Sequence, residues 1–251
     1  YGKNFGVASL ATCIAALAAV PYIAIQLKAI SGSFDLFTRH LGGTSMGGEF
    51  VIADFSFLVA AALGLFAVLF GTRHADATEH QNGLILAVAV ESIVKLTAFL
   101  AVGISVTFAY FGSPADFFSV NQNNPSVAAA LSYQTPISTW LVLILLSGFA
   151  IILLPRQFHV MIVENRDDRE MRTAAWLFPL YLVAINLFVL PIAMAGHLHL
   201  PAGTPADLFV LALPLTAGAD WLSLLVFIGG LSAATAMVIV ASVALSIMIS
   251  N

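Results

Sequence analysis

The chain has 251 residues, of which 60% are hydrophobic and 9% charged, and its mean hydropathy is +0.99. A soluble domain carries about 25% charged residues and could not bury this much apolar surface, so the composition indicates an integral membrane protein. The net charge of −4 excludes a basic surface for nucleic acid. The single cysteine, Cys13, excludes a disulfide framework and a cysteine metal cluster.

Six apolar runs approach or exceed the roughly 20 residues that a bilayer-spanning helix needs. Because a backbone in lipid must satisfy its own hydrogen bonds, we expect these runs to be helices. They cover residues 5–30, 53–70, 84–111, 137–163, 174–196 and 221–250. Because the chain begins with Tyr1 and ends within an apolar run, we expect it to be a segment of a longer polypeptide.

The basic residues predict how these spans are oriented. If the first span starts in the cytoplasm, most basic residues lie on cytoplasmic flanks, as the positive-inside rule requires. We therefore expect a multi-pass protein with both ends of the segment in the cytoplasm, and external loops over residues 31–48, 112–135 and 197–216. The cytoplasmic flanks hold Lys3, Arg73, Arg156, Arg166, Arg169 and Arg172, against Lys28 and Arg39 on the external side.

The first expected span carries two polar side chains, Tyr22 and Gln26, four residues apart on one helix face. They could bind a solute, but interhelix hydrogen bonding or a position in the interfacial aromatic belt is the simpler explanation.

The third expected span contains Glu91 and Lys95, which also share a helix face. A charge within a bilayer costs about 2.5–3.5 kcal/mol on insertion scales, so such residues face partners or a cavity. Two interpretations remain open. The residues form a structural pair that neutralises itself, or they couple ion or proton movement, since a lysine shielded from water can release its proton near neutral pH.

The fourth and sixth spans contain helix-weakening or small residues. Gly148 weakens the fourth span and Pro155 removes a backbone donor, which suits either the broken helix of a secondary transporter or a simple proline kink. In the last span, Ser232 and Thr235 lie among alanines after Gly229 and Gly230, which suits close helix packing or cation coordination. Hydrolase, zinc-protease and Walker-type motifs are all missing from the sequence, so we expect no enzyme.

Several stretches resemble the sodium/solute symporter family, and more closely the symporter-type membrane domain of CbrA-type bacterial sensor histidine kinases. The match rests on the order and spacing of motifs such as Pro21-Tyr22, Glu91-Ser-Ile-Val-Lys95 and Leu154-Pro-Arg-Gln-Phe-His159. The matching stretches are residues 1–3, 17–29, 71–80, 90–96, 154–165 and 231–238.

The resemblance implies an all-α polytopic membrane protein that is part of a LeuT-like inverted-repeat fold. That fold has ten core helices, of which this segment would supply the third to the eighth. The fourth span would then be the broken sixth core helix, and Tyr22 would approach the solute from the third. Glu79, next to Thr78, would act at the inner gate or ion exit. The resulting solute-contact candidates are Tyr22, Gln26, Ser147, Gly148, Phe149 and Ile151.

One position departs from the family pattern. Sodium symporters place two adjacent hydroxyl residues on the eighth core helix, whereas the matching stretch here reads Ala233-Ala234-Thr235-Ala236. In some sodium-independent relatives of the fold, a lysine on the fifth core helix takes the place of sodium. Our hypothesis is that Lys95, with Glu91, replaces the cation and supports proton coupling, with Thr235 and Ser232 as the remaining candidate ion ligands.

The resemblance therefore implies secondary active transport of a small polar solute, such as the amino acid histidine. Transport would proceed by alternating access with Na⁺ or H⁺ as coupling ion and without a bound cofactor or a metal site. A kinase domain in the same chain and a response regulator would be the partners, at the bacterial cytoplasmic membrane. The alternative is a solute-sensing input domain of a two-component kinase without net transport.

Overall fold

The computed structural model describes residues 4–42, 55–66, 82–113, 117, 132, 134–163, 165 and 167–250, and all regular secondary structure among them is helical. Two of the helical segments are not α-helices: η3 is a π-helix and η4 is a 3₁₀ helix. In chain order the elements are α1 (Phe5–His40), α2 (Phe55–Phe66), α3 (Asn82–Phe111), α6 (Ile137–Leu153), α7 (Pro155–Phe158), η3 (His159–Val163), α8 (Asp168–Asn186), α9 (Val189–His199), η4 (Ala206–Leu208), α10 (Phe209–Thr216) and α11 (Asp220–Ser250).

Four stretches in the described part are helical, long and apolar enough to cross a membrane, which confirms the membrane character that the composition predicts. The second and fourth expected spans contain shorter described helices, α2 with 12 residues and α6 with 17. The four long stretches are Phe5–His40, Leu86–Phe111, Arg169–His199 and Asp220–Ile249.

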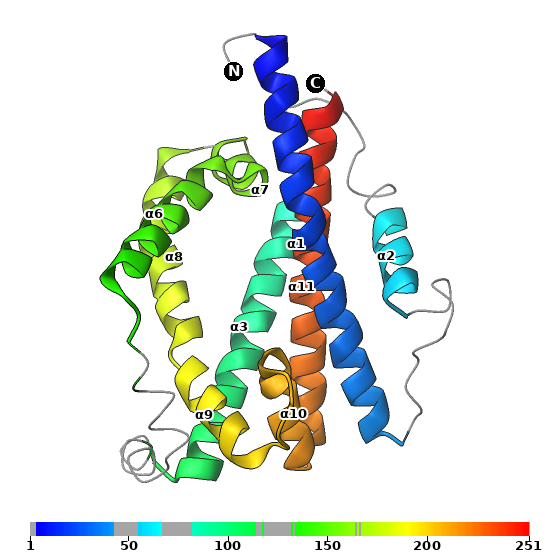
Figure 1. Ribbon diagram of the computed structural model, residues 1–251, viewed down its shortest axis with the longest axis vertical. Helices are drawn as coiled ribbons and strands as arrows, with labels where there is room; N and C mark the ends of the chain where they lie inside the picture. Colours follow the sequence, from blue (N-terminus) through cyan, green and yellow to red (C-terminus); the bar gives the residue numbers. More distant parts are fainter. Residues whose placement is uncertain are drawn as a thin grey trace.

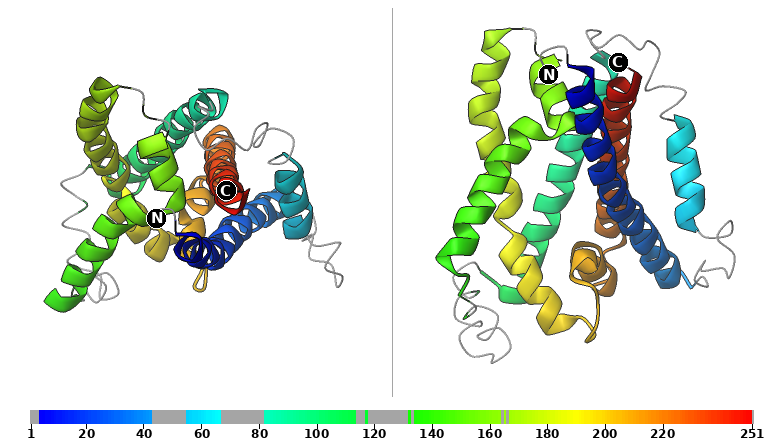
Figure 2. Two further views of the ribbon diagram at one scale, coloured as in Figure 1. Left: turned by 90° about the horizontal axis from the view of Figure 1, so that it is seen from above. Right: turned by 45° about the horizontal axis from the view of Figure 1, so that its top comes forward.

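The helices α1, α3 and α11 run side by side through the molecule (Figure 1). The start of α1 and the end of α11 lie at one end, and α9 and α10 lie at the other, which we call the α10 end. Seen from above, α6 and α8 stand away from this group of three (Figure 2). No residue of α6 is buried, and most of α8 is exposed as well, so both helices present apolar surface that suits lipid.

The buried core lies towards the α10 end. It is built from α3, α9, α10 and the first half of α11, with Val102, Ala195 and Leu213 fully buried. Two glycines make this packing possible. A Cβ at Gly103 would overlap the Phe188 side chain, and a Cβ at Gly196 would overlap Phe209, so each aromatic ring is seated on a glycine.

The first helix is longer than its sequence suggests. The segment 31–48 is expected to be a loop, but its residues 31–40 continue α1 to His40. Phe37 explains this, because its ring stacks on Phe227 of α11 with 5.1 Å between centroids. An ion pair between Arg39 Nε and Asp35 Oδ2 at 2.9 Å supports the last turn.

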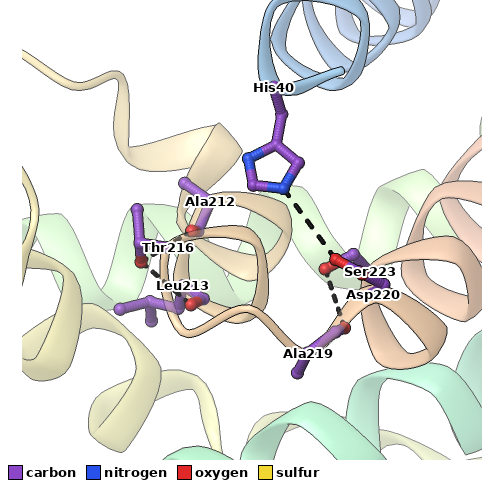
Figure 3. A network of polar contacts seen from close by, with 7 residues as sticks. All are labelled: His40, Ala212, Leu213, Thr216, Ala219, Asp220 and Ser223. Carbon is purple, nitrogen blue, oxygen red and sulfur yellow. Dashed lines mark hydrogen bonds and ion pairs between the residues drawn. The ribbon is translucent and has the colours of Figure 1, made fainter. Parts of the chain in front are cut away.

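The end of α1 meets the start of α11 at the α10 end. His40 Nε2 lies 3.9 Å from Asp220 Oδ1, and the Ser223 hydroxyl donates to the Ala219 carbonyl oxygen at 3.0 Å (Figure 3). The expected loop over residues 197–216 is also partly helical, since it contains η4 and α10. Apolar burial of α10 against α11 accounts for this order.

Helices α3 and α11 approach each other closely at Gly229. A Cβ there would lie 3.0 Å from the Ala98 Cβ and 3.8 Å from both the Lys95 Cα and the Val94 carbonyl oxygen. Its neighbour Gly230 has no such contact within 4 Å. Of the two adjacent glycines that suggest small-residue packing, Gly229 therefore packs against α3, whereas Gly230 does not.

We predict that Gly229→Leu destabilises the protein by about 1–3 kcal/mol, because the side chain must push α11 away from α3. Gly230→Leu is the matched control. It should be neutral or stabilising by up to about 1 kcal/mol, because leucine favours helix more than glycine does. Thermal unfolding of the full-length protein in detergent measures both, and equal losses would contradict the close packing at Gly229.

Candidate functional site

The charged residues Glu91 and Lys95 lie near the middle of α3, one turn apart and both partly buried. They are close enough to interact electrostatically, but they form no ion pair with an N–O distance of 4.0 Å or less. Each side chain instead has a contact with a different neighbouring helix. We call Glu91, Lys95, Ser232 and Tyr181 the charged cluster.

The carboxyl group of Glu91 lies close to α11, with the Ser232 side chain within reach of it. Its second oxygen, Oε2, is buried and has no hydrogen-bond partner in the described part of the chain. A buried carboxylate oxygen without a partner is costly and is therefore uncommon in a purely structural pair. The Oε2 atom of Glu91 thus has unused capacity to accept a hydrogen bond or a proton.

The ammonium group of Lys95 faces α8. Its Nζ lies 5.9 Å from the centre of the Tyr181 ring, which is within the range of a cation–π interaction. The Tyr181 hydroxyl in turn donates to the Ser92 carbonyl oxygen over a long distance of 3.5 Å. The Tyr181 ring therefore interacts weakly with the Lys95 ammonium group and does not neutralise its charge.

These contacts bear on the two interpretations of Glu91 and Lys95 that the sequence leaves open. Because the two groups reach towards different helices, they do not simply cancel each other's charge. The arrangement joins α3, α8 and α11 through ionisable groups, so a change of protonation would alter contacts between helices. The arrangement therefore differs from a closed ion pair between the two side chains.

Thr235 lies one turn beyond Ser232 on α11. Its hydroxyl donates to the Leu231 carbonyl oxygen of its own helix at 2.7 Å. Of the two candidate ion ligands on α11, Ser232 is thus the one in contact with the charged cluster. Among the described residues, no group of three or more His, Cys, Asp or Glu side chains could hold a metal ion.

The interruption of the fourth span lies later than Gly148. Helix α6 continues through Ser147, Gly148, Phe149 and Ile151 and ends at Leu153. The next residue, Leu154, has an extended backbone, and Pro155 starts α7. Proline disfavours a helical conformation at the residue before it, which accounts for the break at Leu154. Phe149 is 56% exposed and Gly148 has open space around it, so this stretch of α6 lies on the surface of the described structure.

The helix break does meet Tyr22. Leu154 and Pro155 line a cavity of about 180 Å³ together with Tyr22 of α1 and Leu245 of α11. We call it the Tyr22 cavity. The structure therefore brings Tyr22 and the helix break together, while Gln26 does not line this cavity. Glu79 lies outside the described residues.

Two groups near Lys95 are not identifiable from the sequence alone. Tyr181 lies on α8, 86 positions after Lys95 in the chain, and no local spacing connects the two. Asp207 shares a second cavity with Lys95, although it belongs to a segment that the sequence predicts as a loop. Only the packing of distant helices reveals either residue.

Comparisons of the chain with family models, with curated proteins and with solved structures gave no match.

We predict that Glu91 and Lys95 are energetically coupled. Lys95→Met removes the cation near the Glu91 carboxylate and should destabilise the protein by about 1–3 kcal/mol. Adding Glu91→Gln removes the remaining charge, so the double variant should lose less than the sum of the two single variants. Chemical unfolding in detergent measures the free energy of unfolding of the full-length parent protein, the two single variants and the double variant.

Lys28→Met is the control, because Lys28 lies exposed on α1, and it should change stability by less than about 0.5 kcal/mol. Strictly additive effects of Glu91→Gln and Lys95→Met would show that the two residues act independently.

Proposed function

We propose that this chain is part of a secondary transporter that moves a small polar solute, such as the amino acid histidine, by alternating access coupled to protons. The observation that carries the proposal is the charged cluster. Glu91 and Lys95 lie within an apolar helix, reach towards different helices, and leave Glu91 Oε2 without a partner. Ionisable groups within a membrane segment are costly and typically belong to ion or proton pathways.

The proposal includes the arrangement that the resemblance implies. The segment would contribute six spans, core helices three to eight of a LeuT-like fold, with both ends in the cytoplasm of a bacterium. The longer chain would continue into a histidine kinase that signals to a response regulator. Support for the arrangement comes from the four long apolar helices and from a helix break that meets Tyr22.

Protons rather than sodium are favoured as the coupling ion by the residues on α11. The Thr235 hydroxyl is bonded to its own helix, and its neighbours are Ala234 and Ala236, which offer no side-chain oxygen. The Lys95 amine can bind and release a proton, with the Glu91 carboxylate as its nearby counter-charge. An ammonium group at this position would act where other transporters of the fold hold a cation.

Uptake of labelled histidine into proteoliposomes that contain the full-length protein tests the coupling ion. We predict that an imposed proton gradient drives accumulation, that a sodium gradient does not, and that Lys95→Met abolishes the response. Thr235→Ala should leave it intact. Sodium-driven uptake that is lost in Thr235→Ala and retained in Lys95→Met would overturn proton coupling. Binding without uptake under either gradient would favour the solute-sensing input domain.

The Tyr22 cavity is the proposed solute site, because the helix break opens onto it. We predict that Tyr22→Ala raises the KM for uptake by roughly tenfold or more, since a wall of the site is lost. Phe149→Ala is the matched aromatic control and should leave KM unchanged, because Phe149 lies on the exposed face of α6. Equal increases would place the solute against α6, as the resemblance alone implies.

A further inference from the structure

A second cavity, of about 210 Å³, lies between α1, α3, α11 and the segment formed by η4 and α10. Lys95 and Ala98 of α3, Ser33 of α1, Val210 of α10 and Asp207 of η4 contribute to its wall. We call it the Asp207 cavity. It is distinct from the Tyr22 cavity, with which it shares no lining residue.

The Asp207 cavity connects a residue in the middle of a helix with the surface at the α10 end. Lys95 is partly buried near the centre of α3, whereas Asp207 is exposed. Since both line the same cavity, the space extends from the surface to the part of α3 that carries Lys95. A volume of about 210 Å³ has room for several water molecules, and the side chains of Ser33 and Asp207 offer them polar partners.

The walls between the two charged residues are apolar. Phe99, Val226 and Phe227 contribute to them, and Gly229 and Gly230 line the cavity on α11. Apolar walls keep the local dielectric low, so the Asp207 carboxylate attracts cations into the cavity more strongly than an open surface would. A charged lysine within a membrane helix is tolerated only where it faces a water-filled cavity or a polar partner.

The other titratable and charged groups of the surrounding elements are distributed unevenly. Within the charged cluster, the Glu91 carboxyl group and the Tyr181 ring are close to Lys95. None of the remaining groups lines the Asp207 cavity. They are Cys13, Tyr22, Lys28, Asp35, Arg39 and His40 on α1, Tyr110 on α3, His197 and His199 on α9, and Asp220 on α11. Asp207 is thus the carboxylate that lines the cavity together with Lys95.

We propose that the Asp207 cavity is the path by which protons reach Lys95 from the α10 end, the external side in the proposed orientation. The Asp207 carboxylate takes a proton from bulk water and passes it through cavity water to the neutral Lys95 amine. Lys95 becomes an ammonium and Asp207 is again a carboxylate. This inference rests on the proposed proton coupling and assigns the group that supplies the proton.

The path itself is tested without any transport measurement. In the full-length protein with Cys13→Ala, single cysteines replace Ser33 or Val210, which line the cavity, or Ile93, which is 65% exposed on the apolar surface of α3. A membrane-impermeant cationic thiol reagent is applied to the α10 side of reconstituted vesicles. We predict that Ser33→Cys and Val210→Cys react and that Ile93→Cys does not, because a thiol in lipid does not ionise.

The role of Asp207 is tested in the same background. Asp207→Asn should slow the reaction of the cationic reagent at Ser33→Cys by roughly threefold, the effect of one nearby charge, and leave a neutral reagent unaffected. Asp35→Asn is the control, because Asp35 is close in sequence to Ser33 but does not line the cavity. In proton-driven uptake, Asp207→Asn should slow transport at neutral external pH and recover at lower pH, whereas Asp35→Asn should behave like the parent protein.

Failure of the two proposals would look different. If no gradient drives uptake but the cavity cysteines react as expected, the proposed transport is wrong and the open cavity stands without a proton role. If uptake is proton-driven while the cavity cysteines are unreactive, or Asp207→Asn transports like the parent protein, Lys95 receives its proton by another path. Sodium-driven uptake that Asp207→Asn weakens would assign the cavity to a hydrated metal cation and overturn the proton assignment.

Discussion

The close contact between α3 and α11 at Gly229 is the constraint on which the charged cluster depends. With only a hydrogen atom at Gly229, α11 approaches Ala98 closely enough for Ser232, less than one turn later, to reach Glu91. A larger side chain would push α11 away from α3. Ser232 would then lie farther from Glu91, and the buried carboxylate would have fewer polar contacts in place of water. The same approach forms one wall of the Asp207 cavity, so packing and access to Lys95 have a common origin.

The two ends of the helical group of α1, α3 and α11 are built differently, and the proposed alternating access would use that difference. At the α10 end, aromatic rings seated on Gly103 and Gly196 fix α9 and α10 in a dense core. Towards the other end, α6 and α7 contribute no comparable core, and the break at Leu154 opens onto the Tyr22 cavity. Cores of high density move as units, whereas sparsely packed helices with a break can change their angle at small cost.

Much of the fold follows from hydropathy, because apolar side chains and backbone hydrogen bonds within lipid admit only helices here. The sequence predicts helices at α3 and α11 with boundaries within a few residues of the structure, but it ends α1 ten residues early. Gly32 and the polar residues Ser31 and Ser33 suggest a loop, whereas tertiary contacts of Phe34 and Phe37 with Phe227 keep the segment helical. Local propensity is weaker than such contacts, so this boundary is beyond sequence analysis.

In the charged cluster, too, some features follow from the local sequence and others depend on tertiary packing. The i to i+4 spacing of Glu91 and Lys95 predicts that both lie on one helix face, since helical periodicity is a local property. Which partners complete the site depends on the packing of α8 and α11, so Tyr181, Asp207 and the choice of Ser232 over Thr235 emerge only in three dimensions. Lys95 has an aromatic ring on one side and a cavity on another, and it forms no ion pair with Glu91. The proposed proton coupling rests on that arrangement rather than on the mere presence of charge in a membrane helix.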